Sequence, residues 1–314
     1  MTFDRHNTVA ASGLDQPEGP VVLSDGRWLV VEMGPSGAVV SIEPGGDLVR
    51  RLHTGRPNGL ALLGSDLLIA ESLQRNVLRV GLEPLLSHRV GDDDVTPVTV
   101  VASHDELGRA MRFPNDLCVG PDGAVYVTDS GVTLATLRAG VKLTNDMDRG
   151  LFDGRIYRIE PDSGKVDTLD DGLGHLNGLS FGPDGDLYVN DTLSGDVVRY
   201  ALTDQPGKVL HKGAFANVID RSVTPPDDPI SVVGPDGQAH DTNGNLYVAV
   251  VNQGEVVVLD DHGRWIERLA TDGRQPTNVA FGLQEAAVYI TECDTGSLQR
   301  IPVAASGLLA PPRV

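Results

Sequence analysis

Residues 175–191 read HLNGLSFGPDGDLYVND, and this stretch decides the fold because it contains one complete β-hairpin. It begins with a short apolar run, LNGLSF, continues through the turn residues PDG at 183–185, and ends with a second run, LYVND. Short apolar runs bounded by Gly, Pro and Asp are typical of antiparallel strands joined by a tight turn. The sequence therefore predicts two strands here, beginning near Leu176 and Leu187.

Five other segments repeat this layout of a Pro-polar opening, a strand, a turn and a second strand. They are residues 16–32 (QPEGPVVLSDGRWLVVE), 56–71 (RPNGLALLGSDLLIAE), 113–129 (FPNDLCVGPDGAVYVTD), 234–250 (GPDGQAHDTNGNLYVAV) and 275–292 (QPTNVAFGLQEAAVYITE). In all but the second repeat, the second strand is expected to begin ten residues after the polar opening residue. Regular repetition at about 40 residues or more is typical of a solenoid or a propeller.

Each hairpin is followed by a third β-rich run, such as Gly254–Leu259, and several by a fourth, such as Leu48–His53. Four strands repeated six times predict an all-β, six-bladed β-propeller with four antiparallel strands per blade. The last repeat lacks an obvious fourth strand, and we expect Asn7–Ser12 to close the ring and cover the open edge. Residues 1–314 would then be a single domain, with Leu134–Leu143 its one expected short helix.

The chain is acidic, with 44 Asp and Glu against 25 Lys and Arg and a formal net charge of −19. This balance argues against binding to nucleic acid or to an anionic membrane, because both need a basic surface. The N-terminus lacks the pattern of a signal peptide, and no apolar run is long enough to span a bilayer. Cys118 and Cys293 do not form a disulfide framework. We therefore expect a cytoplasmic protein with reduced thiols.

A column of oxygen-bearing side chains opens the six repeats: Glu18, Asn58, Asn115, Asn177, Asp236 and Thr277. Because first strands surround the central channel of a propeller, we expect these side chains to converge. An all-oxygen set with two carboxylates favours Ca²⁺, with Mg²⁺ or another divalent cation as the alternative, whereas zinc prefers His and Cys. Asn-Gly and Asp-Gly pairs are also ordinary turn residues, although each hairpin already has its own turn.

A second polar column closes the second strand of five repeats: Glu32, Glu71, Asp129, Asp191 and Glu292. Antiparallel pairing returns these residues to the end of the blade where the first strand started. Solvated strand ends are one interpretation. As a set, the carboxylates of Glu32, Asp129 and Asp191 are predicted to orient the Asn ligands from a second shell around the cation.

The order and spacing of these motifs resemble the senescence marker protein/gluconolactonase family of calcium-dependent propellers, and also diisopropyl-fluorophosphatase. The matching pieces are PEG at 17–19, FPND at 113–116, LNGL at 176–179 with PDG at 183–185, and PDG at 235–237 with GNLYVA at 244–249. The resemblance implies calcium held by Glu18, Asn177 and Asp236, with Asn115 as a fourth ligand or a substrate contact. It also implies that Asp236 is the nucleophile or general base. Gluconolactonase-like members often carry an Arg two residues before the Asn that matches Asn115. Here Phe113 stands there, and Arg112 lies one residue further back.

The predicted function is a calcium-dependent hydrolase of a small-molecule lactone or cyclic ester. The cation would polarise the carbonyl oxygen, and Asp236 would attack it or activate water. Phosphotriester or fluorophosphate hydrolysis at the same site is one alternative, and a non-catalytic, metal-stabilised binding propeller is another. Asn58, Asn115, Arg112 and His175 are the predicted substrate contacts. Two insertions, about residues 130–153 and 216–233, are expected to lie over the funnel mouth, since loops on a rigid scaffold set specificity.

Overall fold

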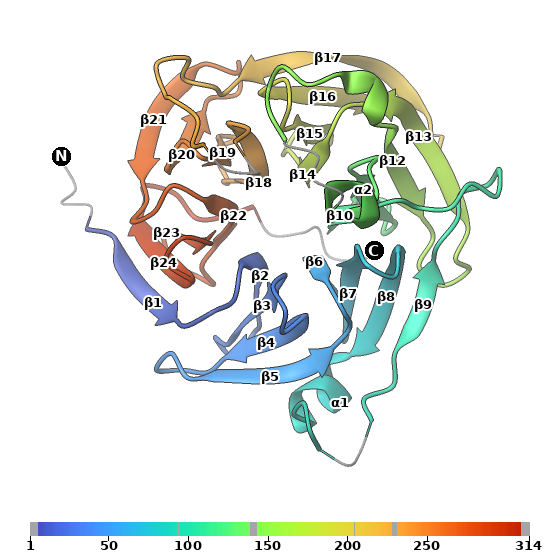
Figure 1. Cartoon of the computed structure of the whole chain (residues 1–314), viewed down its shortest axis with the longest axis vertical. Helices are drawn as coiled ribbons and strands as arrows, with labels where there is room; N and C mark the ends of the chain where they lie inside the picture. The colour runs from blue at the N-terminus through green and yellow to red at the C-terminus, as the bar shows by residue number, and fades with distance from the viewer. Residues whose placement is uncertain (1–5, 93–94, 139–142, 204, 228–230, 309–314) are drawn as a thin grey trace.

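The computed structural model describes residues 6–92, 95–138, 143–203, 205–227 and 231–308. Within them, six four-stranded antiparallel sheets stand side by side in a ring (Figure 1). The predicted six-bladed β-propeller is confirmed. Five blades are continuous in sequence and run outward from the axis in chain order. This order places the first strand of each blade at the central channel.

The strand bounds follow the repeats. The first five blades are β2 to β5 (Pro17–Val22, Trp28–Glu32, Ala38–Ile42, Leu48–His53), β6 to β9 (Pro57–Leu63, Asp66–Glu71, Asn76–Gly81, Thr99–Ala102), β10 to β13 (Pro114–Val119, Val125–Asp129, Gly154–Ile159, Val166–Leu173), β14 to β17 (Leu176–Phe181, Leu187–Asp191, Asp196–Leu202, Val209–Asn217) and β18 to β21 (Gly234–His240, Leu246–Val251, Glu255–Leu259, Trp265–Ala270). The second strands begin at the predicted residues in all repeats with the ten-residue spacing.

The sixth blade is built from both ends of the chain. Strands β22 (Pro276–Phe281), β23 (Ala287–Glu292) and β24 (Ser297–Pro302) form its inner part, and β1 (Thr8–Ser12) is its outermost strand. Strand β1 pairs antiparallel with β24, from Thr8 opposite Arg300 to Ser12 opposite Ser297. The predicted closure of the ring by an N-terminal strand is therefore confirmed.

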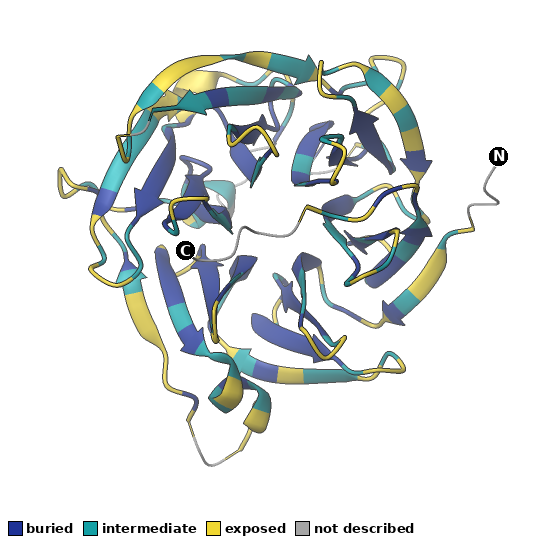
Figure 2. Ribbon diagram, turned by 180° about the vertical axis from the view of Figure 1, so that it is seen from behind, coloured by how far each residue is buried: buried dark blue, intermediate teal, exposed yellow. Residues whose placement is uncertain are grey.

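The core lies between neighbouring blades. One cluster joins Leu68 and Ala70 of the second blade to Val125, Val127 and Tyr157 of the third, and all five side chains are buried. The other blade interfaces repeat this arrangement with Val, Ile and Leu. Figure 2 shows the consequence: the inner strands are mostly buried, and exposed residues gather on the outer strands and the turns.

In the described part of the chain, three short helices lie in the loops: α1 (Leu82–Ser87), α2 (Leu134–Arg138) and η1 (Arg149–Leu151). Helix α2 falls within the predicted helix at Leu134–Leu143, of which residues 139–142 lie outside the described part. Helix α1 was not predicted. Its Pro84 lies in the first turn, where backbone N–H groups have no partner inside the helix, and Leu85 packs into the core. Within the described residues, no helix has the length and apolar character required to cross a bilayer.

Candidate metal and substrate site

The first strand of every blade carries a β-bulge at the polar column. The pairing register shifts by one residue between Glu18 and Val21 in the first blade, and at the matching place in the other five. A regular strand points successive side chains to opposite faces, and a bulge re-aims them locally. This explains how two consecutive residues, Asn115 and Asp116, can both be directed toward the channel.

Three carboxylates meet at this level, on β2, β10 and β18. Glu18 and Asp116 are buried and Asp236 is partly buried. Burial is the main cause that raises the pKa of Asp116 to about 7 and the pKa of both Glu18 and Asp236 well above their usual range. The charge of Asp116 raises the pKa of Glu18 and of Asp236 further. No Lys, Arg or His of the described residues contributes a compensating charge to these three groups.

Two oxygen atoms of the polar column have no hydrogen-bond donor. They are Oε1 of Glu18 and Oδ1 of Asn115, and both are buried. The amide nitrogen of Asn115 donates to Ser130 Oγ over 2.9 Å, and that of Asn177 donates to Thr192 Oγ1 over 3.3 Å. These bonds fix which end of each amide faces its own blade. A buried acceptor without a donor is costly and calls for a partner such as an ion.

The donor set suits a hard divalent cation. Within the described part of the chain, no three His, Cys, Asp or Glu side chains are grouped so that they could hold a metal by themselves. A site here therefore depends on the amide oxygens of Asn115 and Asn177 together with the carboxylates of Glu18 and Asp236. Mixed carboxylate and amide oxygens are the ligands that Ca²⁺ accepts in proteins.

The carboxylates of the second polar column accept hydrogen bonds from the loops at this end of the blades. Glu32 accepts hydrogen bonds from Ser36 and Arg50, and Asp129 accepts them from the backbone N–H groups of Arg112, Phe113 and Gly131. Asp191 accepts a bond from the N–H of Leu193. These carboxylates lie at the correct end of the blades, but their hydrogen bonds hold the loops. Ser130 and Thr192, one residue further along, hold the Asn side chains instead.

The predicted substrate contacts lie around this centre. Asn58 is buried in the column itself. His175 is buried two residues before Asn177, and its Nδ1 has no partner. Burial lowers the pKa of His175 to about 4, so the ring is neutral at pH 7. Arg112 donates to the carbonyl of Gly131 over 3.0 Å, and its side chain is 40% exposed.

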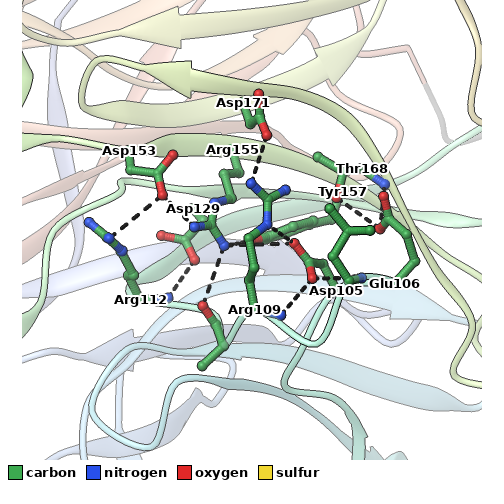
Figure 3. A network of polar contacts seen from close by, with 12 residues as sticks. Asp105, Glu106, Arg109, Arg112, Asp129, Asp153, Arg155, Tyr157, Thr168 and Asp171 are labelled. Carbon is green, nitrogen blue, oxygen red and sulfur yellow. Dashed lines mark hydrogen bonds and ion pairs between the residues drawn. The ribbon is translucent and has the colours of Figure 1, made fainter.

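Arg112 belongs to a larger polar network at the rim of the third blade (Figure 3). Its guanidinium lies 3.6 Å from Asp153, which also pairs with Arg155. Arg155 in turn lies 3.8 Å from Asp105. The network anchors the loop before β10 and the end of the first insertion, and thereby limits how far Arg112 can move.

The two insertions meet each other at the end of the channel where β14 and β18 begin. Val132, Leu143 and Phe152 of the first insertion pack with Leu193 and Val232 in a buried apolar cluster. The ring of Phe152 also lies edge-on to His175, with 5.8 Å between the centroids. The insertions are therefore joined beside the mouth, and the first one contacts a predicted substrate residue.

Asn145 makes the hydrogen bonds that connect the two insertions, and we call these bonds the clasp. Its Nδ2 donates to the carbonyls of Leu193 and Val233, and its Oδ1 accepts from the N–H of Val233 over 2.9 Å. The N–H of Ser231 adds a bond to the carbonyl of Leu143 over 3.0 Å. Both edges of the amide are thus used to hold the second insertion.

The opposite end of the channel is a separate space. A cavity of about 900 Å³ is lined mainly by apolar side chains from the far halves of the first strands, including Val21, Leu62, Val119 and Phe281. Asp116 lies at its inner end. Asp116 thus belongs both to the carboxylate cluster and to the lining of this cavity.

The comparisons with known proteins agree with the propeller fold. The sequence model described as "SMP-30/Gluconolactonase/LRE-like region" matches residues 16–294. The chain belongs to this family. It is similar to a gluconolactonase of Zymomonas mobilis, with 26% identity over 303 residues, and the alignment covers 90% of this chain and 78% of that protein. It is also similar to the pentonolactonase XacC of Haloferax volcanii, with 29% identity over 54% of this chain and 61% of that protein.

Solved structures of related proteins show the same fold. A gluconolactonase of Xanthomonas campestris superposes with a TM-score of 0.74 and 24% identity, covering 96% of this chain and 91% of the other. Regucalcin of Agrobacterium tumefaciens, described as a calcium-binding protein, superposes with a TM-score of 0.74 and 20% identity, covering 98% and 96%.

Two residues of the candidate site in this SMP-30/gluconolactonase-family chain were not predicted from its sequence. Asp116 supplies the third carboxylate, and Asn278 donates a hydrogen bond to Glu18. The polar column that we identified contains their neighbours, Asn115 and Thr277. The residues that directly follow the polar column carried a signal. Four of these six residues are glycines, at 19, 59, 178 and 237, and the two exceptions are Asp116 and Asn278.

Proposed function

We propose that the protein hydrolyses a lactone with the help of a divalent cation, Ca²⁺ in the first place, bound by Glu18, Asn115, Asn177 and Asp236. The observation that carries this proposal is the cluster of three carboxylates beside two buried oxygens without a donor, Oε1 of Glu18 and Oδ1 of Asn115, with no cationic side chain acting on the carboxylates. Buried carboxylates without a compensating charge are unfavourable, and a bound cation would supply that charge. Lactonases among the relatives supply the reaction class.

A cation in this place supplies electrostatic stabilisation for the negative charge that develops on a carbonyl oxygen. Asp236 is the residue to which we assign the attack on the lactone carbon or the activation of water. As a residue, Asp236 is half-buried, whereas Glu18 is buried. Of these two proposed ligands, we therefore assign the reacting role to the one that is less enclosed.

The remaining residues would bind and orient the substrate. Asn58 and the neutral ring of His175 can donate or accept hydrogen bonds without altering the charge of the site. Arg112 at the rim can reach an oxygen of the substrate from outside the cluster. The joined insertions beside the mouth would exclude water and select the size of the ring.

The experiment is a panel of aldonolactones and phosphotriesters, assayed with Ca²⁺, with Mg²⁺ and with a chelator. Asp236→Asn should lower kcat by at least about 100-fold, because it removes the reacting group. Asp184→Asn, in the distant hairpin of the fourth blade, should leave kcat/KM unchanged. Full lactone turnover by Asp236→Asn, or turnover that resists chelation, would overturn the proposal, as would hydrolysis of phosphotriesters alone.

A further inference from the structure

The residues that follow the polar column form a second ring around the axis. This ring contains four glycines and only two longer side chains, those of Asp116 and Asn278. A Cβ atom on Gly59 would overlap Asp116, and one on Gly237 would overlap Asn278. Gly59 and Gly237 are therefore required by close approach, because they leave the room that the two polar side chains occupy, whereas Gly19 and Gly178 approach the backbone of the next blade.

Asn278 connects two carboxylates that come from other blades. Its Nδ2 donates to Glu18 Oε2 over 3.0 Å and lies 3.4 Å from Asp116 Oδ2. The partners are separated from it by 260 and 162 residues of sequence. The amide is held at its other end, since its Oδ1 accepts from the N–H of Val279 over 2.8 Å. Its backbone N–H donates to Thr291 Oγ1 over 3.0 Å.

From these contacts we infer that Asn278 is a positioning residue for Glu18. The two protons of its amide face Oε2 of Glu18 and Asp116, and the N–H of Gly19 also donates to Oε2. Oxygen Oε1 is left without a donor. Asn278 thereby fixes the rotation of the carboxylate so that the bare oxygen is the one available to the cation. This inference rests on the proposed function.

The chemistry of the amide suits this role better than that of a charged donor. A Lys or Arg at position 278 would also hold Glu18, but its positive charge would neutralise the cluster and compete with a divalent cation. Asn contributes two donor hydrogens and no net charge. It separates Glu18 from Asp116 while preserving the negative potential that attracts the cation.

The test is calcium binding, measured by titration calorimetry on the full chain. Asn278→Leu keeps the branched shape of the side chain and removes the donor, and we expect the Kd for Ca²⁺ to rise by about 10- to 100-fold. Raising the calcium concentration should restore kcat, which a general structural defect would not allow. Asn76→Leu is the matched control, because Asn76 is also buried with an unpartnered Oδ1 but lies in β8, the third strand of its blade, outside the polar column.

A second variant keeps the amide. Gly237→Ala should displace Asn278 through the added Cβ and therefore also raise the Kd for Ca²⁺. Thermal unfolding of the chelator-treated proteins shows whether both variants fold. Wild-type affinity in Asn278→Leu and Gly237→Ala would overturn the inference and leave the proposed function intact. Absence of calcium binding by the wild-type chain would overturn both.

Discussion

The pH dependence of stability in the chelator-treated protein tests the buried carboxylate cluster directly. Burial raises the pKa of Asp116 from 3.8 to about 7. Between these two values the folded state holds a proton that the unfolded chain has released, so this group loses its stabilising effect as the pH rises. The difference corresponds to about 4 kcal/mol, since each pKa unit is worth about 1.4 kcal/mol.

Two buried histidines change the stability in the opposite direction over nearly the same pH range. Burial lowers the pKa of His175 and His240 to about 4, so each favours the unfolded state below pH 6.5. The pH dependence of the free energy of unfolding of the wild-type protein alone is therefore not informative. The comparison with Asp116→Asn removes this contribution, because both proteins carry the same histidines.

The assay is urea unfolding of wild type and Asp116→Asn in chelator at pH 5, 6, 7 and 8. We expect Asp116→Asn to be the more stable protein at pH 8, by a few kcal/mol, and the difference to shrink toward pH 5. Calcium should diminish the difference at pH 8, because the cation compensates the charge of Asp116. A difference that stays constant across the four pH values, or a wild type that is more stable at pH 8, would refute the reasoning.

Three further changes follow from the structure. Asn145→Ala removes the clasp between the insertions, and we expect a raised KM with little change in kcat, together with faster proteolysis at the insertions. His175→Gln should raise KM without moving the pH optimum of kcat, because the ring is already neutral; a shifted optimum would contradict this. Leu67→Ala, at a fully buried position between the first two blades, should lower the free energy of unfolding by about 3 kcal/mol in urea titrations.

The fold could be predicted because each blade repeats the same local signals. Turns such as PDG at 183–185 and the ten-residue spacing to Leu187 fix the hairpin register without reference to the rest of the chain. The closing strand Thr8–Ser12 was predictable from the missing fourth strand of the last repeat. Helix α1 was not, because its six residues are stabilised by packing of Leu85 rather than by a helical period.

The candidate site could be predicted only in part. Aligning the repeats brought Glu18 and Asp236 to one column, but strand periodicity implies that the next residue points away. The bulges change this direction, and they are visible only in the pairing. The hydrogen bonds of Asp129 could be predicted only in part as well: its position at the mouth was predictable, whereas the direction of its carboxylate toward loop N–H groups was not.

The clasp at Asn145 has a consequence for exchanging specificity among such propellers. The two insertions are 88 residues apart at the Asn145–Val233 bond, yet each supplies the groups that satisfy the other's backbone. A substitute for residues 130–153 taken from a relative would leave Val233 and Leu193 without their hydrogen-bonding partner. Grafts that transfer both segments together should fold around the new substrate, and grafts of either one alone should not.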